Sequence, residues 1–263
     1  MIVKSVDGKS IFYEVHGDVT SLRTIVFLNG LSQTTKSWGL MAPFFSNFRL
    51  VFIDFIFQGS SDQDGEMRDF NQHAQDVLSV MDHLAISTPI LIGLSYGSLV
   101  AQNYAVNYSS RVEKLVLLST FAHKTPYYEA IELSWSRALE IGGYSLMLDV
   151  MMPFVLSDNY FQNPLIPVEL LKSARKEMIE AVSLRKLMEA TEKRPDYRKE
   201  LEKIKVSTLV IHGDSDTLFS VDLGRQVANS IPNALFVIIP RTGHTLNLES
   251  VDLVNAEVSK FLN

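Results

Sequence analysis

The chain has 263 residues, of which 46% are hydrophobic and 21% charged, so it can bury one sizeable core and is not a disordered protein. Its 24 basic and 30 acidic residues leave a net charge of −6, which gives no electrostatic basis for binding nucleic acid. The absence of cysteine excludes disulfides, a thiolate nucleophile and cysteine-based metal sites.

The first part of the chain predicts a hairpin followed by buried strands. Residues 2–16 form two short extended segments around Asp7-Gly8, a dipeptide typical of tight turns. Apolar runs without alternation follow at 24–28, 50–53, 90–94 and 115–118, as expected for parallel strands buried on both faces. Residues 70–84 repeat apolar side chains at spacings of three and four, which indicates a helix.

The last part of the chain repeats the same alternation, with strands at 208–211 and 235–239 and helices near 222–230 and 251–262. This order predicts an α/β fold in which helices flank both faces of a mostly parallel sheet. Between residues 121 and 205 no strand pattern appears. We interpret residues 1–120 and 206–263 as the core and residues 121–205 as a helical cap inserted after the sixth strand.

The longest apolar runs, such as 25–28 and 235–239, are far shorter than the roughly 20 residues of a transmembrane helix. The amino terminus becomes polar before a signal-peptide apolar region could form. We therefore expect a cytoplasmic protein with no membrane partner. The six histidines form neither an HExxH motif nor a His-rich tract, so no metal site is predicted.

A candidate nucleophile lies in Gly93-Leu94-Ser95-Tyr96-Gly97, between a predicted buried strand and a predicted helix. In the G-x-S-x-G pattern the serine occupies a tight strand-to-helix turn, and the glycines remove Cβ atoms that would clash there. The backbone N–H of Tyr96 and the helix amino terminus would then face a developing oxyanion. The alternative is an ordinary helix N-cap serine.

A serine nucleophile needs a base and an orienting acid. Asp216 follows the predicted strand that ends near residue 211, and His244 follows the one that ends near residue 239. Loops that leave successive parallel strands emerge at the same edge of the sheet, so the three side chains can meet, and the order Ser, Asp, His fits this arrangement. Asp214 is the rival acid, and His212 is interpreted as a packed residue rather than the base.

On these motifs the chain resembles the α/β-hydrolase fold superfamily over essentially its whole length, in particular capped serine esterases, lactonases such as enol-lactonases, and C–C hydrolases. The resemblance assigns the nucleophile to Ser95, the acid to Asp216 and the base to His244. It implies that the second oxyanion donor is the backbone N–H of Leu31, in Asn29-Gly30-Leu31, where Asn29 replaces a usual histidine. No cofactor is implied.

The family segment Asp-x-x-Gly-x-Gly-x-Ser appears at residues 54–61 with Phe57 in place of a glycine. Phe57 either narrows the pocket or packs against the cap, and Asp54 is interpreted as a turn-stabilising carboxylate. Cap residues that could form an apolar pocket wall, or belong to the core instead, are Trp135, Met147, Met151, Met152 and Phe154. Cap arginines that could bind an acidic substrate, although most such arginines are solvated, are Arg137, Arg175, Arg185 and Arg194.

The sequence therefore predicts a serine hydrolase that cleaves a small to medium carboxylic ester or lactone through an acyl-enzyme intermediate. The expected partner is this small-molecule substrate. Two alternatives remain open: a C–C bond hydrolase of the same fold, and a ligand receptor or signalling protein that retains the three residues.

Overall fold

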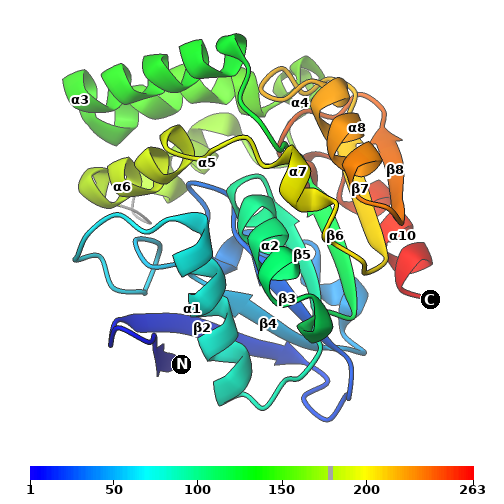
Figure 1. Ribbon diagram of the computed structural model, residues 1–263. Coiled ribbons are helices and arrows are strands. Elements are labelled where there is room, and N and C mark those ends of the chain that lie inside the picture. Colours follow the sequence, from blue (N-terminus) through cyan, green and yellow to red (C-terminus); the bar gives the residue numbers. More distant parts are fainter. Residues whose placement is uncertain (177–179) are drawn as a thin grey trace.

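The computed structural model describes residues 1–176 and 180–263, and in this part of the chain eight strands form one sheet (Figure 1). The strand order is β1-β2-β4-β3-β5-β6-β7-β8. The hairpin strands β1 and β2 run antiparallel, β2 also pairs antiparallel with β4, and the strands from β4 to β8 are parallel to one another. The strands are β1 (Ile2–Lys4), β2 (Ser10–Gly17), β3 (Thr24–Leu28), β4 (Arg49–Ile53), β5 (Ile90–Leu94), β6 (Lys114–Leu118), β7 (Thr208–Gly213) and β8 (Ala234–Ile239).

Two hydrophobic clusters cover the two faces of the sheet. On one face, alternate strand residues such as Val26 and Leu91 pack with α1 (Phe70–His83), α2 (Tyr96–Asn107) and α8 (Val221–Ser230). On the other face, Phe27 and Ile92 pack with α10 (Val251–Leu262) and the 3₁₀ turns η1 (Thr35–Trp38) and η2 (Ala42–Phe45). A short turn, η3 (Ser109–Arg111), precedes β6, and α9 (Leu246–Glu249) precedes α10. Because neighbouring residues of a strand point to opposite faces, burial on both sides explains the uninterrupted apolar runs.

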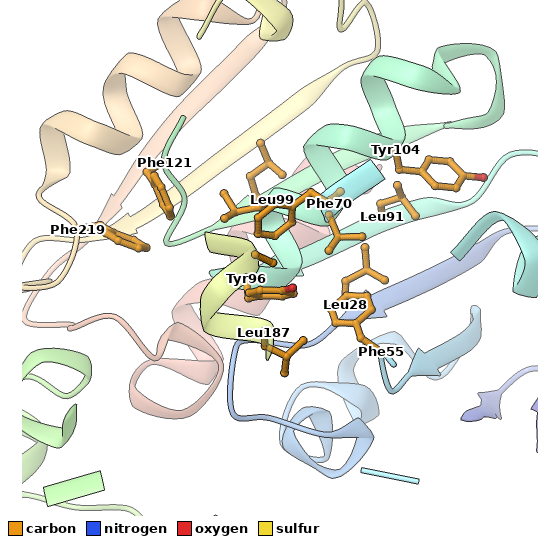
Figure 2. Packing of buried hydrophobic residues seen from close by; sticks show 14 of the residues in the cluster. Leu28, Phe55, Phe70, Leu91, Tyr96, Leu99, Tyr104, Phe121, Leu187 and Phe219 are labelled. Atoms are coloured by element: carbon orange, nitrogen blue, oxygen red, sulfur yellow. The ribbon is translucent and has the colours of Figure 1, made fainter. Parts of the chain in front are cut away.

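The segment between β6 and β7 contains only helices in its described residues, and in Figure 1 these helices form a layer beside one end of the sheet. They are α3 (Pro126–Val155), α4 (Asp158–Gln162), α5 (Val168–Lys176), α6 (Ala181–Glu192) and α7 (Arg198–Leu201). Residues 121–205, here called the cap, share the first hydrophobic cluster with the core through side chains such as Trp135, Met147 and Leu187. Figure 2 shows Leu187 next to Tyr96 in this packing.

Helix α3 is the one helix among the described residues that is long and apolar enough to cross a membrane. It is interrupted at Gly143, where φ is 66° and ψ is −167°, so neither half reaches the roughly 20 residues that a span requires. Buried side chains in both halves, among them Trp135, Leu139, Met147 and Met151, pack in the core cluster. These features are those of a core helix.

The fold predicted from the sequence is confirmed. Each of the four central apolar runs is a strand, with bounds that differ from the expected ones by at most one residue, and the helical insertion follows β6. The residues of the candidate site lie in the loops at the carboxyl ends of β3, β5, β7 and β8.

Candidate active site

Ser95 lies in a strained turn between β5 and α2. Its φ of 52° is in the left-handed region, which is uncommon for a residue with a Cβ. The flanking glycines make this turn possible: a Cβ on Gly93 would lie 2.4 Å from the carbonyl oxygen of Gly97, and one on Gly97 would lie 2.0 Å from that of Leu28. The backbone therefore holds Ser95 at the end of a buried strand, as in a nucleophile elbow.

The turn is also held by hydrogen bonds on its inner side. The Ser98 hydroxyl donates to the carbonyl oxygen of Ser95 over 2.6 Å, and Ser98 Oγ also lies within hydrogen-bond distance of Thr120 Oγ1, at 2.8 Å. Helix α2 begins at Tyr96, so the backbone N–H of Tyr96 is in the first turn, where amide groups have no partner within the helix. The Tyr96 ring points away into the core between Phe70 and His73. Only the backbone of Tyr96 can therefore serve an oxyanion.

His244 and Asp216 form a buried pair. Asp216 Oδ2 lies 2.9 Å from His244 Nδ1, and Asp216 Oδ1 accepts hydrogen bonds from the backbone amides of Leu218 and Phe219, each at 2.9 Å. A carboxylate can only accept, so Nδ1 carries the hydrogen and Nε2 is left as a proton acceptor. The rival acid Asp214 is exposed and accepts a hydrogen bond from the Ser215 hydroxyl instead.

His212 lies on the other side of the same carboxylate. Its Nε2 is 3.0 Å from the carbonyl oxygen of Phe219 and 3.5 Å from Asp216 Oδ2. Complete burial lowers the pKa of His212, so the ring is neutral and Nε2 donates to the carbonyl oxygen. Gly224 packs against the ring so closely that a Cβ there would lie 2.3 Å from His212 Nδ1. His212 is therefore a packed residue beside Asp216, in agreement with its interpretation from the sequence.

The loop that carries His244 is anchored by a residue that the sequence did not single out. The Glu249 carboxylate accepts hydrogen bonds from the backbone amides of Gly243 and Thr245 at 3.1 and 3.2 Å, and from the amide of Ser157 in the cap at 3.0 Å. The Ser119 hydroxyl donates to the carbonyl oxygen of His244 over 2.7 Å. Glu249 has no motif that distinguishes it from other surface glutamates, and only the folded loop brings these amides together.

Ser95 and His244 line one cavity of about 40 Å³ between the core and the cap. Of the other predicted residues, Leu31, Trp135 and Met151 also line it, whereas Asn29, Phe57, Tyr96, Met147, Met152, Phe154 and Asp216 do not. The remaining lining residues are Gly30, Ser32, Gln33, Leu94, Val155, Leu218 and Thr245. The structure thus brings together side chains from the loops after β3, β5, β7 and β8 and from α3.

Asn29 is fully buried behind the loop that contains Leu31 and does not line this cavity. Its Nδ2 donates to the carbonyl oxygen of Ile53 over 2.8 Å and to Asp54 Oδ1 over 3.2 Å, and its Oδ1 accepts from Trp38 Nε1 over 2.8 Å. Asp54 also accepts from the backbone amide of Thr35, in agreement with a structural role. Asn29 therefore supports the loop that contains Leu31.

Phe57 and Phe154 are also placed by packing rather than by the cavity. The φ of Phe57 is 78°, which explains why a glycine is usual there, and its buried ring packs beneath the Lys186 ammonium of α6 at 4.6 Å. Of the two alternatives for Phe57, narrowing the pocket or packing against the cap, this contact corresponds to packing against the cap. Phe154 is partly buried at the end of α3 and packs against the core cluster.

Of the predicted cap arginines whose side chains the structure describes, Arg137, Arg185 and Arg194, none lines the cavity. Arg194 is buried, donates to Gln102 Oε1 over 2.7 Å and packs on the rings of Phe70 and Tyr197. Arg185 donates to Glu192 over 2.5 Å. The side chain of Arg175 lies outside the described residues, as do residues 177–179 of the predicted cap.

Comparisons with known proteins identify the family of the chain. A family model described as "Serine aminopeptidase, S33" matches residues 22–250. The chain belongs to this hydrolase family, within the α/β-hydrolase superfamily.

Relatives of the chain match it over at least nine-tenths of its length. The AB hydrolase superfamily protein YisY of Bacillus subtilis is 28% identical over 99% of this chain and 98% of its own. The 2-hydroxy-6-oxononadienedioate/2-hydroxy-6-oxononatrienedioate hydrolase of Paraburkholderia phymatum is 28% identical over 91% of this chain and 86% of its own. The solved enol-lactonase of Burkholderia xenovorans matches with a TM-score of 0.90 and 24% identity, covering 100% of this chain and 99% of that one, which supports the fold.

Proposed function

We propose that this hydrolase cleaves an uncharged carboxylic ester or lactone with Ser95 as nucleophile, His244 as base and Asp216 as the acid that orients the base. The observation that carries the proposal is the buried Asp216–His244 pair, at 2.9 Å, whose histidine lines the same cavity as Ser95. A serine hydroxyl requires such a base to become a nucleophile at neutral pH.

The reaction proceeds in two steps. His244 Nε2 takes the proton of Ser95 Oγ as the oxygen attacks the acyl carbon, and the backbone N–H groups of Leu31 and Tyr96 stabilise the oxyanion, each by about 3 kcal/mol. The protonated His244 then gives the proton to the leaving alcohol, which departs and leaves an acyl-Ser95 ester. A water activated by the same histidine hydrolyses this ester and releases the acid.

The lining of the cavity favours an uncharged substrate. Its described lining residues include no lysine or arginine, and Trp135, Met151, Val155 and Leu218 make much of the wall apolar. A dicarboxylate, which the named substrate of the Paraburkholderia relative is, would need a cationic partner when desolvated. This argues for the ester over the C–C hydrolase alternative.

The test combines a substrate panel with a covalent label. p-Nitrophenyl acetate and butyrate should be hydrolysed with many turnovers, Ser95→Ala should abolish hydrolysis, and a fluorophosphonate should attach to Ser95 as mapped by mass spectrometry. A single burst of nitrophenol without further turnover would instead support the receptor. Labelling at another serine, or unchanged turnover in Ser95→Ala, would refute the proposal.

A further inference from the structure

A second and much larger cavity adjoins the one that contains Ser95. It measures about 340 Å³ and lies between the loop of residues 33–40, α5 and α9. Four of its lining residues are large and apolar: Leu40, Ile166, Leu171 and Leu248. Its one charged lining residue among those described, Lys36, is exposed to solvent. The apolar part of the lining suits an alkyl or aryl group.

The two cavities meet at Gln33 and Thr245, which line both. Gln33 bridges the neck: its Oε1 accepts from the Gly30 amide over 3.1 Å, and its Nε2 donates to Asn247 Oδ1 over 3.4 Å. The second bond is long and therefore weak, so the amide group can shift when a ligand passes. A substrate bound at Ser95 would reach the larger space past these two side chains.

The sizes of the cavities divide a substrate into two parts. At roughly 10–15 Å³ for each water, the first cavity of about 40 Å³ holds about three waters, which is the size of a short acyl group. Trp135, Met151 and Val155 close it on the cap side. The larger cavity offers several times that space.

The chemistry of the proposed triad decides which part enters which cavity. The protonated base must reach the oxygen of the leaving alcohol, so that group departs beside His244. Thr245 follows His244 directly and lines the neck, and Gln33, two residues after Leu31, lines its other side. Because the neck opens next to the base, we assign the leaving group to the larger cavity.

We propose that the substrate is an ester of a short acyl group with a longer apolar alcohol, and that the alcohol portion binds in the cavity beyond Gln33 and Thr245. This inference rests on the proposed function, because it uses the acyl-transfer reaction to assign the two portions. It adds the substrate class that the triad alone does not specify.

Two series of esters test this assignment. In acetates of methanol, butanol and hexanol, kcat/KM should rise with the alcohol, by up to about fourfold for each methylene. In methyl esters of acetic, butyric and hexanoic acid, kcat/KM should fall beyond three carbons. An increase along the acyl series, with none along the alcohol series, would overturn the proposal.

Paired variants on α5 locate the alcohol. Ala174 lines the larger cavity, so Ala174→Trp should lower the ratio of kcat/KM for hexyl acetate to that for methyl acetate at least tenfold. Leu170 is 59% exposed and does not line the cavity, so Leu170→Trp adds the same ring to α5 and should leave the ratio unchanged. An unchanged ratio in Ala174→Trp, or an equal decrease in both variants, would refute the assignment.

A binding measurement separates the two proposals. Calorimetry should detect 1-hexanol binding to the Ser95→Ala variant, with at least tenfold weaker affinity once Ala174→Trp is added. This readout needs no turnover. If the protein binds 1-hexanol but neither hydrolyses esters nor is labelled at Ser95, only the proposed reaction is rejected. If it does not bind the alcohol and shows no selectivity along the alcohol series, the subsite is rejected.

Discussion

The hydrogen bonds of Asp216 predict how an Asp216→Asn substitution changes the tautomer of His244 and, through it, kcat. Oδ1 accepts two backbone amides, from Leu218 and Phe219, so the oxygen of an asparagine must take that place. The NH₂ group then occupies the place of Oδ2, 2.9 Å from His244 Nδ1. Two N–H donors cannot face each other at this distance, so His244 must carry its hydrogen on Nε2 and accept at Nδ1.

In this tautomer His244 cannot take the proton of Ser95. We expect kcat for p-nitrophenyl acetate to fall by about 10⁴ in Asp216→Asn, which corresponds to a barrier higher by about 5.5 kcal/mol. KM should change little, because the substitution leaves the cavity wall in place. Initial rates at saturating ester, together with thermal unfolding to show that the variant folds, provide the measurement.

Asp214→Asn is the matched control, since Asp214 is exposed, lies two residues away and contacts Ser215 rather than the histidine. Its kcat should stay within about twofold of the original. A loss of less than tenfold in Asp216→Asn, or a larger loss in Asp214→Asn, would refute the assignment of the acid.

Two further substitutions test neighbouring features. In Gly224→Ala the new Cβ would lie 2.3 Å from His212 Nδ1 and would push the His212 ring toward Asp216. We therefore expect kcat to fall at least tenfold with KM unchanged. An unchanged kcat would contradict a positioning role for His212. Burial raises the pKa of Glu132 in α3 to about 7, so its stabilising contribution is complete below pH 4 and is lost as the pH rises through 7. The free energy of unfolding, measured with urea, should therefore be lower at pH 8 than at pH 5 by up to about 3 kcal/mol, and this decrease should be smaller in Glu132→Gln. Equal decreases in the original protein and the variant would exclude Glu132 as the cause.

The sequence by itself determined the layered fold, because burial of a strand on both faces requires a local pattern of apolar residues. A central parallel strand must be apolar at every position, and an amphipathic helix must repeat at three and four residues. The turn around Ser95 also has a local record, since two glycines are needed where Cβ atoms would meet the backbone of Gly97 and Leu28. The expected positions of Ser95, Asp216 and His244 followed from the order of strands in a parallel sheet.

Only the tertiary structure decided which side chains face the substrate. Asn29 and Phe57 depart from the family pattern, but Asn29 is buried behind the loop that contains Leu31 and Phe57 is buried beneath α6. On α3, Met151 and Val155 are four residues apart and share the face that lines the cavity, whereas Phe154 does not. The rotation of that face depends on the break at Gly143 and on packing against the core.

The contacts of Glu249 and Gln33 were likewise invisible in the sequence. Each binds backbone amides or side chains that come from separate loops, and Gln33 meets Asn247 across a sequence separation of 214 residues. Pattern and propensity report what a residue does with its near neighbours. The shape of the site depends on contacts between the cap and the loops that follow four strands, and no local sequence pattern indicates these contacts.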